Sequence, residues 1–394
     1  MKKLLSVILM AALLLTMLAG CSAAGGKDDF KVGFIFLHDE NSTYDKNFLD
    51  AALAATEALG LSEDQVMIKT NIPESNECYE AAAELVDDGC DVVFADSFGH
   101  ESFILQAAQE FPEVEFCHAT GTMAHTAGVK NFHNAFASIY EGRFLAGVAA
   151  GMKLNEMIEN GTITADQAKM GYVGAYPYAE VKSGYTSFFL GAKYICPSVT
   201  MDVRFTNSWF DIAAEKEAAI SLINDGCVLI SQHADSEGAP KACEENNVPN
   251  VAYNISTISI APTTALISSK IDWQPYMELM IKSAQEGTEI PVDYCGTIAT
   301  GSVKLTELNA ACAAAGTAEK IEEVKALITS GELKVFDTAT FTKDGAALTT
   351  YLADVDTDDA FTPDTEAIAG GAFEESKHRS APYFDIDIDG ITLK

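Results

Sequence analysis

The chain is poor in basic residues. Its 394 residues include 25 Lys and Arg against 58 Asp and Glu, which gives a formal net charge of −33. A field of this sign repels phosphate backbones, so we expect no nucleic-acid partner. Proline is also scarce, at 11 residues, while 48% of the residues are hydrophobic, which argues against wholesale disorder. At about 150 residues per domain, the length predicts two or three domains.

Closely spaced cysteine pairs are absent. The sequence has nine cysteines but no C-x-x-C motif, and most of them lie beside apolar residues. We interpret the eight that follow Cys21 as small buried hydrophobic residues, and the spacing assigns no disulfides. His233 and Asp235 are too few to form a metal site alone. The sequence therefore predicts neither a metal nor a cofactor.

The amino terminus predicts export. Lys2 and Lys3 precede an apolar stretch, 4–18, which is shorter than the about 20 apolar residues of a spanning helix. We therefore expect a signal peptide over residues 1–20. Leu18-Ala-Gly-Cys21 resembles a bacterial lipobox, which implies that Cys21 carries acyl chains such as palmitate; the alternative is an ordinary signal-peptidase site. Residues 21–30 then form a lipid-anchored linker on the outer face of a bacterial cell membrane.

Apolar, β-branched runs alternate with helical periodicity through the middle of the chain. Because fully apolar strands covered by helices on both faces form parallel sheets, this pattern predicts an α/β fold with two doubly wound parallel-sheet lobes. The predicted strands are 31–37, 65–69, 91–95 and 115–118, then 170–175, 200–206, 228–232 and 250–252, with a final candidate at 333–336. The predicted helices are 47–59, 78–87, 103–111, 138–154, 181–192, 213–224, 239–246 and 317–330, the last ended by Gly331.

Ligands of such sheets bind beyond the carboxyl ends of the strands. In this chain several strand ends carry an aromatic ring beside a polar side chain, a combination that favours a planar heteroaromatic ligand. For Tyr44 and Trp209 taken singly, packing within a lobe is the alternative. The candidate ligand-binding residues from these loops are Tyr44, Asp45, Ser97, Phe98, Tyr176, Trp209, Asp211 and Asp235.

Three segments resemble the basic membrane protein family, the lipoprotein substrate-binding components of ABC importers that include purine nucleoside receptors. Tyr140-Glu-Gly-Arg-Phe-Leu-Ala-Gly147 is similar to the family's E-G-x-F-L-A-G helix. Asn207-Ser-Trp-Phe-Asp-Ile-Ala-Ala-Glu-Lys-Glu217 is similar to its N-x-W-x-D-P-x-x-E-K-E stretch, and Phe116-Cys-His-Ala-Thr-Gly121 is the third. The resemblance covers about residues 31–341.

The resemblance implies a type I periplasmic-binding fold that closes on its ligand by hinge motion. It places Tyr44 where the family stacks an aromatic ring on a purine, with Asp45 and Asn47 alongside. Thr120 matches a base-reading position, Trp209 and Asp211 belong to the second-lobe loop, and Asn254 follows the strand whose tip contacts the sugar.

The sequence departs from the family at the ribose contacts. Nucleoside receptors place an Asp near Asn254 and a Lys near Ile271, whereas this chain has Tyr253-Asn254 and Lys270-Ile271. On a strand, a shift of one residue turns Lys270 to the opposite face. We expect Trp273 to join Tyr44 around a smaller and flatter ligand, so that a free purine base such as adenine is as good a candidate as a nucleoside.

The lobes are expected to comprise residues 31–137 plus about 270–295, and residues 138–269 plus about 296–344. Residues 345–394 read as an acidic extension, in which Asp354–Asp359 and Asp385–Gly390 space carboxylates as calcium loops do but lack the twelfth-position Glu. We interpret these two segments as a solvated loop and a terminal strand.

The function predicted is that of a non-enzymatic solute-binding lipoprotein, which delivers a purine base or nucleoside to ABC permease and ATPase subunits. The alternatives are a sugar or quorum-signal receptor of the same fold, a structural or adhesive role, and a surface hydrolase. The sequence has no G-x-S-x-G motif, which leaves Ser97 as the one candidate nucleophile.

Overall fold

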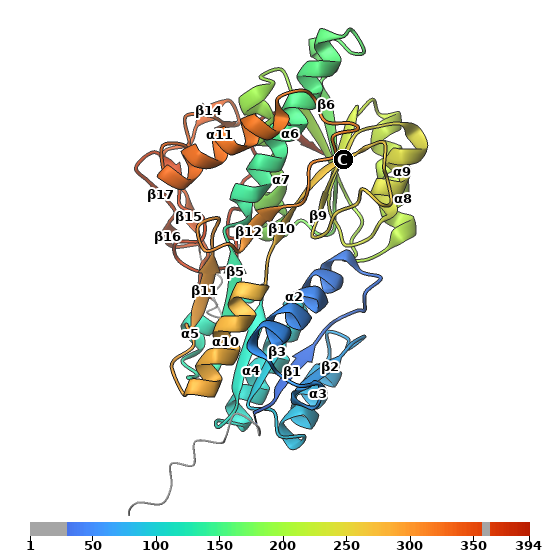
Figure 1. Ribbon diagram of the computed structural model, residues 1–394. Coiled ribbons are helices and arrows are strands. Elements are labelled where there is room, and N and C mark those ends of the chain that lie inside the picture. Colours follow the sequence, from blue (N-terminus) through green and yellow to red (C-terminus); the bar gives the residue numbers. More distant parts are fainter. Residues whose placement is uncertain (1–29, 357–362) are drawn as a thin grey trace, which may run out of the picture.

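The computed structural model describes residues 30–356 and 363–394 as two lobes, each built on a central sheet with helices on both faces (Figure 1). The predicted signal peptide and Cys21 lie outside these residues, as does the end of the acidic segment Asp354–Asp359. Within the described residues no helix is long and apolar enough to cross a membrane.

The first lobe contains a six-stranded parallel sheet in the order β11-β5-β4-β3-β1-β2. Three of its six strands are fully buried, as expected for the interior of a parallel sheet covered on both faces. Its strands are β1 Val32–Ile35, β2 Val66–Lys69, β3 Val92–Ala95, β4 Glu115–Ala119, β5 Phe132–Ala137 and β11 Asp293–Gly296. Its helices are α2 Thr43–Leu59, α3 Asn76–Asp87, α4 Glu101–Glu110, α5 Ala124–Ala127 and α10 Gln274–Glu286, with short 3₁₀ turns at Glu63–Gln65 and Phe98–His100.

The second lobe has a seven-stranded sheet in the order β12-β10-β9-β8-β6-β7-β19, parallel except for the β10–β12 pair. Its strands are β6 Lys169–Gly174, β7 Thr200–Phe205, β8 Leu229–His233, β9 Asn250–Tyr253, β10 Ala265–Ile271, β12 Val303–Leu305 and β19 Ile391–Leu393. Its helices are α6 Ile139–Glu159, α7 Ala179–Ile195, α8 Ile212–Asn224, α9 Gly238–Asn246 and α11 Thr317–Ser330, with a 3₁₀ turn at Ala165–Gln167.

Three antiparallel pairs of two-residue strands lie between α11 and β19 in the described residues. They are β13 Thr342–Lys343 with β14 Ala346–Ala347, β15 Leu352–Ala353 with β16 Thr365–Glu366, and β17 Ile368–Ala369 with β18 Ala372–Phe373.

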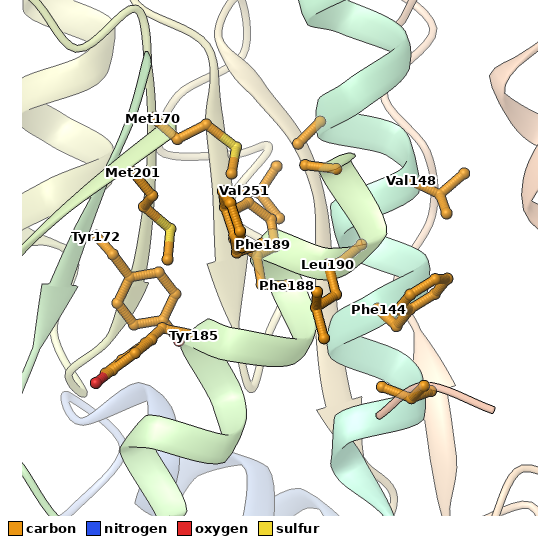
Figure 2. Packing of buried hydrophobic residues seen from close by; sticks show 14 of the residues in the cluster. Phe144, Val148, Met170, Tyr172, Tyr185, Phe188, Phe189, Leu190, Met201 and Val251 are labelled. Atoms are coloured by element: carbon orange, nitrogen blue, oxygen red, sulfur yellow. The ribbon is translucent and has the colours of Figure 1, made fainter. Parts of the chain in front are cut away.

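Helices α6 and α7 cross at unusually close range. A Cβ added to Gly147 of α6 would clash with the backbone carbonyl of Phe188, and one added to Gly191 of α7 would clash with that of Phe144. Figure 2 shows Phe144 and Phe188 beside this crossing. Gly147 is the last residue of the E-G-R-F-L-A-G segment, so the glycine of this motif serves the packing of two helices.

The chain passes between the lobes three times. It passes from β5 to α6, from β10 to α10, and from β11 to β12. The loops at the carboxyl ends of both sheets face a common cleft. Ligands of such folds bind there, and the lobes close by rotation about the crossovers.

Some predicted elements are wrong or were missed. Residues 333–336 form a bend and a turn instead of a strand. Val335 and Phe336 are buried in the core of the second lobe, and pairing with β18 is limited to the Phe373 N–H donating to the Phe336 carbonyl and an isolated bridge between Asp337 and Ala372. Strand β5 was not predicted, since His133 and Asn134 interrupt its apolar run, yet all six of its residues are buried.

The segment 345–394 is not a separate acidic extension. Strand β19 pairs with β7 at the edge of the second sheet. Phe384 and Ile386 are fully buried in the core of that lobe, while the ammonium of Lys182 lies 2.7 and 3.3 Å from the carboxylates of Asp385 and Asp387. The alternating burial predicted for Asp385–Gly390 is present, but these residues form no strand, and the terminal strand is Ile391–Leu393.

All eight cysteines in the described residues are free, and seven are buried. Burial raises the pKa of the Cys90 and Cys117 thiols to about 12. The interpretation of these residues as small buried hydrophobic groups is confirmed for seven of the eight, and Cys295 is only half-buried.

Candidate functional site

A small cavity, with a free volume of about 20 Å³, lies between the two lobes. Because its walls come from the carboxyl-end loops of both sheets, it occupies the position expected for a ligand of this fold. The lining residues are Leu37, His38, Tyr44, Asp45, Ser97, Phe98 and Thr120 from the first lobe and Glu180, Trp209, His233 and Asp235 from the second.

The first-lobe wall is built around Asp45 in the first turn of α2. Ser42, the N-cap of this helix, donates its hydroxyl to Asp45 Oδ2 at 2.6 Å. The backbone N–H of His38 donates to Asp45 Oδ1 at 2.7 Å, and the His38 ring lies 3.3 Å from Oδ2. Burial alone would raise the pKa of Asp45, but these hydrogen bonds outweigh it and lower the pKa below 3.8. Asp45 is therefore a charged acceptor at neutral pH.

Tyr44 lies beside Asp45 with its hydroxyl fixed. The phenol donates to the carbonyl oxygen of Asp96 at 2.7 Å, and the ring packs against Phe48 with centroids 4.9 Å apart. The Asp96 side chain is fully buried, and burial together with neighbouring Asp45 raises its pKa well above 3.8. The Tyr44 ring is thereby held at the cavity wall by its polar tip.

Thr120 adopts a strained backbone conformation at the end of β4. Its φ is +66°, which is unusual for a β-branched residue, and its buried hydroxyl has no hydrogen-bond partner. The next turn is anchored by Glu101, whose carboxylate accepts the backbone N–H groups of Thr122 and Met123 at 2.7 Å each and the Asn134 amide at 2.8 Å. This anchor places a free hydroxyl at the cavity.

The second-lobe wall begins with the loop after β7. Trp209 lines the cavity, and its ring meets Tyr176 edge to face with centroids 5.1 Å apart. Asn207, at φ +57°, makes the turn that leads into this loop, and Thr206 donates its hydroxyl to the carbonyl of Ser208 at 2.9 Å. A half-buried indole therefore lies on a rigid loop.

Asp235 follows β8 and is almost fully buried. Burial, followed by the nearby carboxylates of Glu215 and Asp45, raises its pKa well above 3.8. The Asn254 amide donates to Asp235 Oδ1 at 3.4 Å. Within β8 the His233 ring lies 3.3 Å from Glu180, and burial lowers the pKa of this imidazole to about 4.

Contacts between the lobes close the cavity. The backbone N–H and hydroxyl of Thr43 both donate to the carbonyl oxygen of Asp235, at 2.9 and 3.1 Å. At the rim the His38 ring lies 5.4 Å from Phe210, measured between ring centroids, and the half-exposed Phe98 lies 6.0 Å from Tyr178. The structure is therefore that of a closed cleft.

Seven of the twelve residues predicted to bind ligand line this cavity, and the other five do not. The seven are Tyr44, Asp45, Ser97, Phe98, Thr120, Trp209 and Asp235. Tyr176 and Asn254 support two of them from behind. Asp211 is the N-cap of α8, accepting the N–H groups of Ala213 and Ala214.

Trp273 and Asn47 need correction. Trp273 lies in the core of the first lobe, 2% exposed and stacked on Phe48 with centroids 4.4 Å apart. It starts α10 after a crossover, so its side chain packs beneath α2 instead of facing the cleft. Asn47 donates its amide to the carbonyl of Ile271 at 2.8 Å, which ties α2 to that crossover.

Four lining residues were not among the predicted ligand-binding set: Leu37, His38, Glu180 and His233. All four lie in or just after loops at strand ends, so their positions in the sequence already indicated that they could line the cavity. None forms an aromatic–polar pair of the kind we used to choose candidates. Lys270 lines a different groove between the lobes, which also contains Lys46 and Asp50.

The hydrolase alternative is not supported at Ser97. Its hydroxyl donates to Glu74 at 2.6 Å, and His118 Nε2 reaches the Ser97 carbonyl oxygen, also at 2.6 Å, instead of the hydroxyl. A serine nucleophile needs an imidazole acceptor for its proton. The described residues also contain no group of three or more His, Cys, Asp or Glu side chains arranged to hold a metal ion.

Solved structures of ABC transporter solute-binding proteins share this fold. One from Aeropyrum pernix superposes with a TM-score of 0.64 at 18% identity, over 78% of this chain and 93% of the other. One from Conexibacter woesei has a TM-score of 0.62 at 20% identity, over 77% of this chain and 98% of the other. The predicted fold class is confirmed.

Sequence relatives are closer. A purine-binding protein of Brucella abortus is 31% identical over 328 residues, 82% of this chain and 88% of the relative. A putative ABC transporter glucose-binding protein of Haloferax volcanii is 34% identical over 217 residues, 55% of this chain and 52% of the relative. Residues 34–337 match the family described as PnrA-like ABC transporter substrate-binding proteins. The chain belongs to this family, Bmp, and is the substrate-binding component of an ABC transporter.

Proposed function

We propose that the cavity between the lobes binds a purine, and that the protein delivers it to the permease and ATPase subunits of an ABC importer. The observation that carries this proposal is the composition of the cavity. The rings of Tyr44 and Trp209 line it from opposite lobes, together with the carboxyls of Asp45 and Asp235. Flat apolar surfaces with a few directed polar groups suit a heteroaromatic ring. The name of the Brucella relative supports the same class of ligand.

The size and charge of the cavity favour a free base over a nucleoside. Its free volume of about 20 Å³ is little more than a single water needs, so a ligand must enter with the cleft more open, and a base needs less room than a nucleoside. The ammonium group of Lys270, which would be a candidate for a ribose hydroxyl, lies in the separate groove between the lobes. We therefore propose that the ligand is the base, without a sugar.

We further propose that the protein acts at the outer face of the cell membrane, held there by acyl chains on Cys21. The motif Leu18-Ala-Gly-Cys21 after an apolar run supports this location. In cells, Cys21→Ser should release the protein from the membrane fraction and abolish incorporation of labelled palmitate. Retention of the labelled lipid by the variant would contradict the assignment.

Calorimetric titration of the protein without residues 1–21 tests the ligand class. We expect binding heat with adenine or another purine base, weaker binding with the matching nucleoside, and none with glucose. The glucose arm addresses the second candidate, a sugar, which the name of the Haloferax relative favours. Binding heat with glucose and none with any purine would show that the ligand is a sugar and not a purine.

A further inference from the structure

Three acidic side chains line the cavity. Asp45, Glu180 and Asp235 line it, whereas no lysine or arginine does among the residues that the structure describes. Asp45 comes from the first lobe and the other two from the second, so closure of the cleft brings like charges together. A phosphate group would meet three acidic side chains here and neither a lysine nor an arginine among the described residues. The ligand therefore bears no phosphate.

The surroundings of Asp235 favour its protonated form. Asp235 is 6% exposed and shares the cavity with the carboxyls of Asp45 and Glu180. The Asn254 amide donates to Oδ1 at 3.4 Å, a long hydrogen bond that favours the charged form, but burial and the acidic neighbours raise the pKa of Asp235 overall. The main chain of Asp235 is fixed at both ends, because its N–H donates to Trp209 and its carbonyl accepts Thr43, at 2.9 Å each. The backbone of Asp235 is thus held against the first lobe, which keeps this residue at the cavity.

Several charged or titratable groups face this carboxyl from the elements packed around it. Arg143 on α6 is a cation, but its guanidinium donates to the Gln232 carbonyl at 2.9 Å and lies 3.4 Å from the centroid of the Tyr253 ring. These groups are Tyr44 and Asp45 on α2, Arg143 on α6, Glu180 in the first turn of α7, Glu215 on α8, His233 on β8 and Tyr253 on β9. Burial and the acidic members of this set raise the pKa of Asp235.

We propose, building on the purine assignment above, that Asp235 binds the ligand in its protonated form, as a paired donor and acceptor. The ligand is then an uncharged aminopurine base such as adenine, whose exocyclic N–H lies next to a ring nitrogen. The N–H donates to one carboxyl oxygen, and the hydroxyl of the other donates to the ring nitrogen. Asp45, which stays charged, supplies an acceptor from the opposite lobe.

Two substitutions separate this inference from a merely structural role. An asparagine has the same shape as a protonated aspartic acid and also pairs a donor with an acceptor, so Asp235→Asn should keep adenine affinity within about threefold. Asp235→Ala should weaken it about tenfold or more, since a buried polar edge of the ligand is left unpaired. Asp211→Asn is the matched control, because Asp211 caps α8 outside the cavity and asparagine caps equally well.

The test is calorimetric titration of the wild type and the three variants with adenine, unsubstituted purine and adenosine 5′-monophosphate, between about pH 6 and 9. We expect adenine to bind the wild type about tenfold more tightly than purine, which lacks the amine, and the nucleotide not to bind. Wild-type affinity for adenine should fall as pH rises. The Asp235→Asn protein should lack the part of that fall due to Asp235, while keeping any contribution of Glu215.

Three results would overturn the inference. Asp235→Asn weakening adenine binding as much as Asp235→Ala would show that a charged carboxylate is required. Equal affinity for purine and adenine would show that the amine is not read. Binding of oxopurines alone would refute this inference while leaving the purine proposal intact, whereas no binding of any purine would refute both.

Discussion

Thr43 and Asp235 join the two lobes through main-chain atoms: the N–H of Thr43 donates to the carbonyl oxygen of Asp235 at 2.9 Å. The Asp235 side chain takes no part in this bond, so it is free to face the cavity that both residues adjoin. The residue that touches the ligand in our proposal thereby also holds the cleft closed. Side-chain substitutions at Asp235 leave this contact in place, which makes them clean tests of ligand recognition.

Replacing Trp209 by alanine should weaken purine binding without unfolding the protein. The indole is half-buried at the cavity wall and contacts Tyr176, so its loss removes a stacking surface. Stacking of a base on an aromatic ring contributes about 1–3 kcal/mol, which corresponds to roughly 5- to 150-fold in Kd. Calorimetric titration with adenine measures the change. Unaltered affinity would show that the ring packs against its own lobe and does not touch ligand.

Replacing Trp273 by alanine should do the opposite. This indole is 2% exposed and stacked on Phe48, so its removal leaves a cavity in the core of the first lobe. We expect the free energy of unfolding to fall by about 3–5 kcal/mol, measured by urea denaturation, with adenine affinity of the folded fraction nearly unchanged. A large loss of adenine affinity with an unchanged free energy of unfolding would show that Trp273 contacts the ligand.

Replacing Glu101 by alanine should loosen the turn that follows Thr120. The carboxylate accepts backbone N–H groups of Thr122 and Met123 and the amide of Asn134, and alanine would leave these buried donors unpaired. We expect a destabilisation of about 3 kcal/mol or more and weaker ligand binding. Thermal unfolding with and without adenine measures both. Glu110→Ala, at the exposed end of the same helix, is the control and should change neither strongly.

Stability should decline with rising pH because of Glu375. Burial raises the pKa of this carboxyl from 4.5 to about 8, and Tyr383 donates its N–H to Oε1 at 2.7 Å. Between these two pKa values the folded protein binds more protons than the unfolded chain, so the free energy of unfolding falls from pH 4.5 up to about 8.

Urea denaturation of Glu375→Gln across this range checks the effect. The amide keeps an acceptor for Tyr383 but does not titrate, so the stability of the variant should depend less on pH than that of the wild type. Glu286→Gln, at an exposed position on α10, should retain the wild-type slope. Identical slopes for both variants would mean that Glu375 does not carry the effect.

Local patterns predicted most of the elements. The alternation of apolar runs with helical periodicity located eight of the strands, and Gly331 ends α11 in the left-handed conformation that glycine favours. The motif around Gly147 was recognisable in sequence, but only the structure shows that it permits α6 and α7 to touch. Strand β5 was not predicted because its run contains polar residues, whose hydrogen bonds to buried partners on other elements, such as that of Asn134 to Glu101, are not visible in the sequence.

The sequence by itself determined the lobes, the family and the loops that meet at the cleft, because strand ends and their neighbours are local features and parallel sheets gather them at one edge. Only the tertiary structure decided which side chains face the ligand. Trp209 and Trp273 both follow strands of the second lobe, yet Trp209 lines the cavity while Trp273 is buried beneath α2. That choice depends on the packing of elements far apart in the chain, as does the raised pKa of Asp235, which burial and carboxyls from both lobes produce.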